Sequence, residues 1–247
     1  YPLLLTLLDF RIDEAQWAAV SVALESYLLR RAVCNLTTKN YNRTFLSLTR
    51  AMRREGATPE RLVSLLLELE GESGEWPTDE AFAEAWHTRQ IYWMLNSPKI
   101  VHILKRLNET YLDKRMETIA ITGNLSVEHI MPQKWGVHWP LSDGVTGLTQ
   151  EQLRQADEND PASIASRRRS QLLQTIGNLT VVTQPLNSTV SNGPWHEKRP
   201  ALLQHSLLPI NQRLQKVDVW DEAAIEQRSA ELLQRALKVW PRGQSKF

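Results

Sequence analysis

Only two short stretches of this 247-residue chain have the pattern of β-strands, and a long polar segment separates them. The stretches are residues 126–130 and 179–182, and the segment between them contains Gly144 and Gly147. Elsewhere, apolar residues recur every three or four positions, which is the spacing of a buried helix face. The sequence therefore predicts a mainly helical protein with one small pair of strands.

Helix signals are clearest in the first half of the chain and at its end. A stripe of apolar residues follows Asp13, a good N-cap, and comprises Trp17, Val20, Leu24, Tyr27 and Leu28. Thr58 followed by Pro59 predicts another helix start, because proline is tolerated at the first helical position. Further helices are expected from about 38–40 to 52, from 78, from about 98 to 112, and from 221 to a stop at 240–241.

Composition limits the class of protein. The chain has 29 Lys and Arg against 28 Asp and Glu, and 42% of its residues are hydrophobic, as in ordinary globular proteins. Its one cysteine, Cys34, excludes an internal disulfide framework or a Cys-rich zinc site and indicates a reducing compartment. The N-terminal apolar run lacks the basic region of a signal peptide, and no stretch reaches the ~18 apolar residues of a membrane span. We therefore expect a cytoplasmic protein without a membrane partner.

Chemically useful side chains gather around the two predicted strands. Glu128 and His129 are neighbours on the first strand, and Pro132 ends that strand early enough to change which way they face. Asn187 and Lys198 follow the second strand. Hydrolysis of a phosphodiester needs a base to activate water and a cation to offset charge, and histidine and oxygen ligands suit these two tasks. A two-strand hairpin packed on a helix would bring His129, Glu128 and Asn187 into one site.

These motifs occur in the order of a known nuclease family. The series Glu-His-Ile-Met-Pro at 128–132, Gly-Asn-Leu-Thr at 177–180, Asn187 and Lys198 resembles the HNH (His-Me finger) nuclease domain at the C-terminus of GmrSD-type modification-dependent restriction endonucleases. This family includes phosphorothioate-sensing anti-phage effectors. Looser similarity covers most of the chain, namely Arg31, Cys34, Thr38, Tyr41, Asn42 and Phe45 before the motifs and Trp220, Ile225, Arg228, Leu232, Trp240 and Pro241 after them.

The resemblance implies a fold and its division into regions. The fold would be mainly α with a small ββα-metal (HNH) core, a helical N-terminal lead-in and a closing C-terminal helix. Residues 1–118 would form a helical subdomain, residues 119–200 the nuclease core, and residues 201–247 a helical segment that packs on the core.

The resemblance also assigns roles to individual residues. His129 would be the general base, and Asn187 and Glu128 would hold Mg²⁺ or Mn²⁺. Asn178 would either hold the loop or orient His129 through hydrogen bonds. Lys198 would steady either a phosphate or the helix that carries Asn187.

The implied function is a metal-dependent endonuclease domain that nicks double-stranded DNA, of foreign or phage origin, in an anti-phage restriction system. The same family carries a nucleotide-hydrolysing N-terminal domain with an Asp-Gly-Gln-Gln-Arg motif. That string does not occur in this chain, so we expect the partner domain elsewhere in the polypeptide. The alternative is a catalytically silent DNA-binding or interaction module that needs the N-terminal half for activity.

Two further features have both a functional and a structural interpretation. Arg167, Arg168 and Arg169 could bind DNA phosphates, because clustered arginines supply sequence-independent affinity, or they could form a solvated helix end. Trp135 and Trp139 are the pair that could stack on a base, with packing in the core as the favoured interpretation. The spacing of zinc proteases, His-Glu-x-x-His, is absent.

Overall fold

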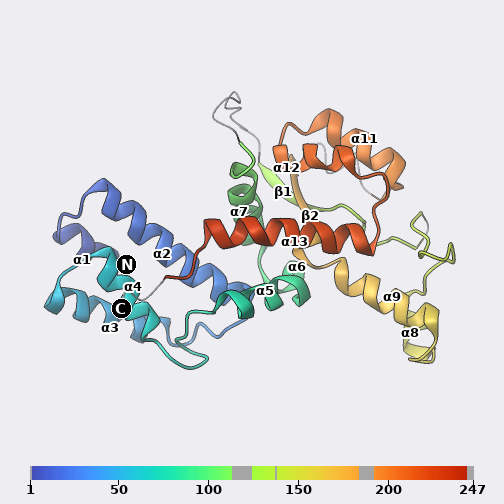
Figure 1. Ribbon diagram of the computed structural model, residues 1–247. Helices are drawn as coiled ribbons and strands as arrows, with labels where there is room; N and C mark the ends of the chain where they lie inside the picture. The colour runs from blue at the N-terminus through green and yellow to red at the C-terminus, as the bar shows by residue number, and fades with distance from the viewer. Residues whose placement is uncertain (1, 113–123, 137, 184–191, 244–247) are drawn as a thin grey trace. The chain divides into compact units, whose positions relative to one another are not determined.

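A computed structural model of the chain describes residues 2–112, 124–136, 138–183 and 192–243, and these are mainly helical (Figure 1). The contacts divide the chain into two compact units. One unit comprises Tyr1–Ala85 and Ala236–Phe247, and the other comprises Trp86–Arg235. The predicted boundaries at 118/119 and 200/201 both fall within the sequence of the second unit. No helix among the described residues is long and apolar enough to cross a lipid bilayer.

Local helix signals explain the first unit. Its helices are α1 (Pro2–Asp9), α2 (Glu14–Val33), α3 (Tyr41–Glu55), α4 (Pro59–Leu67) and most of α5 (Asp79–Thr88). The predicted N-cap Asp13 is confirmed, since its side chain accepts a hydrogen bond from the Gln16 amide in a capping box. Thr58 caps α4 in the same way. The helix α1 was not expected from the sequence; its apolar run buries Leu3 and Leu7 in the unit's core.

Two buried arginines close the first unit around its irregular segments. The Arg31 guanidinium donates hydrogen bonds to the carbonyls of Glu72 and Glu75, at 3.0 and 2.7 Å. Arg30 donates to the carbonyl of Trp240, at 2.8 Å. Such hydrogen bonds to carbonyls offset the cost of burying a guanidinium. The two arginines therefore fix the loop 71–77 and Trp240 against α2.

The second unit contains the predicted strands and more helix than the sequence pattern indicated. Besides the strands and the end of α5, its described elements are α6 (Ile91–Met94), α7 (Ser97–Glu109), α8 (Gln150–Gln155), α9 (Pro161–Leu172), η1 (Ile176–Asn178), α11 (Trp195–His205), α12 (Pro209–Gln212), η2 (Arg213–Lys216) and most of α13 (Glu222–Val239). The polar segment between the strands thus forms α8 and α9. Thr149 and Asp160 cap these two helices through their side chains.

The two predicted strands pair with each other. Strands β1 (Leu125–His129) and β2 (Leu179–Thr183) form an antiparallel two-stranded sheet, with Glu128 opposite Thr180 and His129 opposite Leu179. The predicted ranges are confirmed to within one residue at each strand end. The core beside the sheet comprises Ile130, Met131, Trp135, Trp139, Leu141, Leu173, Val182, Trp195, Leu202, Leu214, Trp220 and Ile225. Residues 184–191, the segment that contains Asn187, lie outside the described residues.

The start of β2 rests directly on α13. A Cβ at Gly177 would lie 2.4 Å from the carbonyl oxygen of Ile225, so only glycine allows this approach. Arg228 of the same helix donates hydrogen bonds to the carbonyls of Gly177 and Leu179, at 2.7 and 2.8 Å. The closing helix predicted from the sequence therefore packs on the sheet and fixes the motif that precedes β2.

Candidate active site at the end of strand β1

His129 is the last residue of β1, and its ring is enclosed, with 6% of the residue exposed. Its Nε2 lies 3.1 Å from Oε1 of Gln174, and the Tyr92 ring packs edge-on at 4.3 Å between ring centroids. With the Gln174 amide in this orientation its oxygen accepts the hydrogen bond, which assigns the proton to Nε2 and the lone pair to Nδ1. The imidazole is thus oriented with one defined acceptor nitrogen.

The surroundings of His129 keep the ring uncharged. Burial lowers the pKa of His129 to about 4; the hydrogen bond to Gln174 acts in the opposite direction, and the charge of Lys198 adds to the lowering. At neutral pH the side chain is therefore a proton acceptor. The backbone amide of Tyr92 donates to the Gln174 carbonyl, at 3.0 Å, which ties α6 to the segment that holds the ring.

Glu128 meets a different partner from its neighbour. The Lys198 ammonium donates to Oε1 of Glu128 at 2.5 Å and to the carbonyl oxygen of His129 at 2.7 Å. Burial raises the pKa of the Glu128 carboxyl, and the charge of Lys198 opposes that rise. Burial likewise lowers the pKa of Lys198, and Glu128 opposes that change. Lys198 thus connects α11 to the end of β1 through a buried ion pair and a backbone contact.

Asn178 holds the chain that follows β1. Its Oδ1 accepts from the Met131 amide at 2.8 Å and from Nε1 of Trp220 at 3.0 Å. Its Nδ2 donates to the carbonyls of Met131 and Leu173, at 2.9 and 3.1 Å. These four hydrogen bonds use the full capacity of one buried amide. Of its two expected roles, the contacts of Asn178 correspond to holding the loop.

The metal ligands inferred from the motif are described only in part. Asn187 lies outside the described residues. Within the part of the chain that the structure describes, no group of three His, Cys, Asp or Glu side chains could hold a metal ion. A carboxylate and an amide oxygen are nevertheless the donors that Mg²⁺ prefers, together with water. The donor chemistry of Glu128 and Asn187 therefore fits the ion, although Lys198 already binds one Glu128 oxygen.

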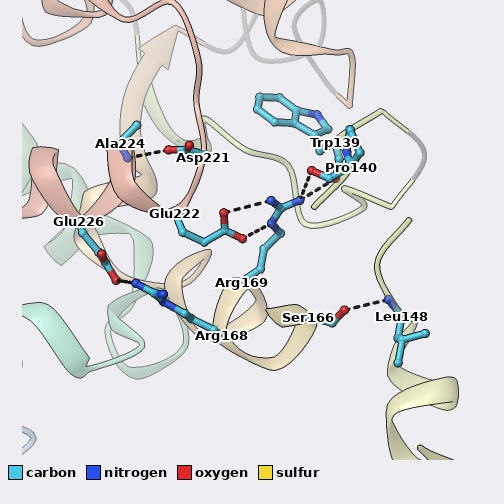
Figure 2. A network of polar contacts seen from close by, with 10 residues as sticks. All are labelled: Trp139, Pro140, Leu148, Ser166, Arg168, Arg169, Asp221, Glu222, Ala224 and Glu226. Atoms are coloured by element: carbon cyan, nitrogen blue, oxygen red, sulfur yellow. Dashed lines mark hydrogen bonds and ion pairs between the residues drawn. The ribbon is translucent and has the colours of Figure 1, made fainter. Parts of the chain in front are cut away.

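The three consecutive arginines of α9 have three different environments, two of which Figure 2 shows. Arg169 is 1% exposed, and its guanidinium binds both carboxylate oxygens of Glu222 and the Trp139 and Pro140 carbonyls. Arg167 donates to the Leu153 carbonyl at 2.6 Å. The Arg168 side chain is 59% exposed and pairs with Glu226. Their predicted contact with DNA stays a prediction, and only Arg168 presents most of its side chain to solvent.

A cavity of about 460 Å³ lies beside this site, and Gln174 is one of its lining residues. Trp93 also lines it, and this residue is 62% exposed. Trp135 and Trp139, in contrast, are 6% and 5% exposed and belong to the core, as the favoured interpretation of the sequence held.

Sequence reasoning did not identify Gln174 and Tyr92, the two residues that contact the His129 ring. Gln174 stands just before the Gly-Asn-Leu-Thr motif, at the end of α9. Its position next to the motif is the one feature of the sequence that could have drawn attention to it, since a lone glutamine has no pattern that indicates burial. Tyr92 lies in a short helix without a cap and gave no signal.

Comparison with known proteins identifies the family. The model of the family described as GmrSD restriction endonucleases, C-terminal domain, matches residues 76–235, which are more than half of the chain and include both strands. No curated protein and no solved structure matches the chain. The family match supports a nuclease role of the restriction-endonuclease type. On this evidence the chain belongs to the family of GmrSD restriction endonuclease C-terminal domains.

Proposed function

We propose that this chain is a metal-dependent DNA endonuclease domain of the HNH type, with His129 as the general base. The orientation of the His129 ring carries this proposal. The ring is neutral, Gln174 fixes its tautomer, and Nδ1 is its proton acceptor. A bound phosphate would place negative charge near the ring and favour the imidazolium that forms when it takes a proton.

The proposed reaction is hydrolysis of one phosphodiester bond. A water oxygen attacks phosphorus while His129 takes its proton, and the bond from phosphorus to the 3′ oxygen breaks, so that one strand is nicked. Glu128 and Asn187 would hold Mg²⁺ or Mn²⁺, whose charge would offset the negative charge on the phosphate and the leaving oxygen. Lys198 holds the Glu128 carboxylate and the backbone of His129, and is a positioning residue in this proposal.

The remaining parts of the proposal concern substrate and context. Double-stranded DNA of foreign or phage origin is the proposed substrate, in the anti-phage role that the resemblance implies. Arg168 is the arginine of α9 best placed to contact a phosphate, because it is the most exposed of the three. A nucleotide-hydrolysing N-terminal domain of the same polypeptide is the proposed partner, and the cytoplasm is the proposed location.

A second candidate function has one observation in its favour. Lys198 binds Oε1 of Glu128, and a metal ion at Glu128 would meet the repulsion of that ammonium. The chain would then be a DNA-binding or interaction module that is silent until the N-terminal half rearranges the site.

Nicking of supercoiled plasmid separates the two candidates. The wild-type chain, His129→Ala and His196→Ala are compared with Mg²⁺, with Mn²⁺ and with a chelator. His196 on α11 is a matched control because its side chain is 80% exposed, whereas the His129 ring is enclosed. We expect metal-dependent nicking that falls by about 10²- to 10⁴-fold in His129→Ala and is unchanged in His196→Ala.

Two results would contradict the endonuclease proposal. One is nicking by a folded His129→Ala at the wild-type rate, with folding checked by circular dichroism because the ring is buried. The other is absence of nicking under every condition while DNA binding persists in chelator, which would favour the silent module.

A further inference from the structure

The cavity beside His129 has walls from four separate segments of the second unit. Trp93 comes from α6, Gln133 and Lys134 from the loop after β1, Gln150 from the start of α8, and Gln174 from the end of α9. Its volume of about 460 Å³ lies in the range of sites for small molecules and for parts of larger ones.

Exposed aromatic and polar groups give this cavity a definite chemistry. Trp93 is 62% exposed, so core packing does not account for it. A flat exposed indole stacks on nucleobases of any sequence. Gln133 and Gln150 carry amides, which donate to and accept from the edges of bases, and Lys134 supplies a positive charge suited to phosphate.

Trp135 also lines the cavity and is held by several contacts. Trp135 is 6% exposed, and the Arg169 guanidinium lies 4.8 Å from the centroid of its ring. Figure 2 shows how Glu222 and the Trp139 and Pro140 carbonyls hold that guanidinium in turn. A Cβ at Gly147 would lie 1.9 Å from Cη2 of Trp135, so the chain passes directly over the indole. The cavity is therefore shaped by fixed groups.

The cavity and the proposed catalytic base share their supports. Gln174 lines the cavity and also accepts the hydrogen bond from the His129 ring. Tyr92, whose ring packs on His129, precedes Trp93 in α6. A ligand group in the cavity is thus separated from His129 by one side chain.

We infer that this cavity receives one nucleobase of the DNA strand, turned out of the base stack next to the phosphate that is cut. The inference rests on the proposed nuclease function and adds a contact to a base. Trp93 stacks on the base, Gln133 and Gln150 bond its edge, and Lys134 binds a neighbouring phosphate. The phosphate that follows the base along the strand then comes close to His129.

Binding to an extrahelical base tests this inference without requiring cleavage. Two duplexes with a single-nucleotide bulge are compared in chelator, one with a base on the bulged nucleotide and one with an abasic residue there. We expect the wild-type chain to bind the base-containing bulge about tenfold more tightly, the usual effect of stacking on one base. Trp93→Ala should abolish this preference.

Two further variants make the result specific. Val219→Ala is the matched control, because Val219 is 66% exposed and does not line the cavity, and it should keep the preference. Lys134→Ala should weaken binding to both duplexes equally and reduce the dependence on salt.

The inference is overturned if the wild-type chain binds the two duplexes equally, binds neither, or keeps its preference in Trp93→Ala. Failure of the nuclease proposal would look different. The preference for the base would then be intact while supercoiled plasmid stays uncut with every metal.

Discussion

Glu128 and His129 are adjacent in sequence, yet each is buried against an opposite kind of partner. His129 faces the neutral amide of Gln174 and an aromatic ring, and it loses its charge. Glu128 faces the Lys198 ammonium in an ion pair. Alternation along a strand separates the two side chains. The comparison teaches that one strand end can present a neutral proton acceptor and an anionic oxygen, each tuned by its own partner.

Removal of Lys198 should have the largest effect on this arrangement. Lys198→Met leaves the Glu128 carboxylate buried without its counter-charge, and we expect a loss of about 3–5 kcal/mol in the free energy of unfolding, measured with denaturant. The double variant Glu128→Gln/Lys198→Met should recover most of this loss. A double variant as unstable as the single one would mean that Lys198 acts through the His129 carbonyl and not through Glu128.

Lowering the pH should remove the contribution of the neutral His129 ring to stability. The folded pKa of His129 is about 4 against an ordinary value of 6.5, so below pH 6.5 the unfolded chain binds a proton that the folded chain does not. The contribution of His129 is present in full above pH 6.5 and is lost as the pH falls towards 4. We expect it to reach up to about 3 kcal/mol.

Denaturant unfolding at a series of pH values measures this contribution. In His129→Gln the free energy of unfolding should fall less steeply over the same pH range, because position 129 then has no titratable group. Parallel pH profiles for the two proteins would contradict the assigned shift.

Changes at Gln174 should have the smallest effect and should sharpen the comparison. Gln174→Leu removes the acceptor of the Nε2 proton, so the pKa of His129 should fall further and the chain should lose about 1 kcal/mol of stability. Gln174→Glu places a carboxylate beside the His129 ring, as Glu128 is placed beside Lys198. The carboxylate would stabilise the protonated ring, so the pKa of His129 should rise. Titration of the His129 ring by NMR distinguishes these shifts, and a pKa that is the same in both variants would rule out Gln174 as the partner.

The sequence predicted the helix starts and the strands, which depend on residues close to one another in the chain. Asp13 and Thr58 cap helices because capping involves residues three positions apart. The two strands were evident as short runs that interrupt the helical spacing of apolar residues. The helices α8 and α9 were not, since their residues are mostly polar and give no apolar stripe.

The motif predicted where the candidate site lies in the chain, but it did not predict which residues surround the site. The motif did not indicate that the His129 ring is enclosed, because Tyr92 and Gln174 cover it from segments distant in sequence. The arginine run looked uniform in sequence, yet helical geometry turns Arg169 inward towards Glu222 and leaves Arg168 outside. Such differences arise from tertiary packing, which a single sequence does not display.

The antiparallel pairing of β1 with β2 also has a kinetic consequence. The strands are joined through residues 130–178, so the end of β1 is completed only when that whole segment has closed, and we expect the sheet to form late in folding. Closure depends weakly on length, since doubling a loop costs roughly 0.6 kcal/mol. The exposed turn at 157–159, between α8 and α9, is thus a place where relatives can gain or lose residues, or where a reporter can be inserted, with little change to the chemistry at His129.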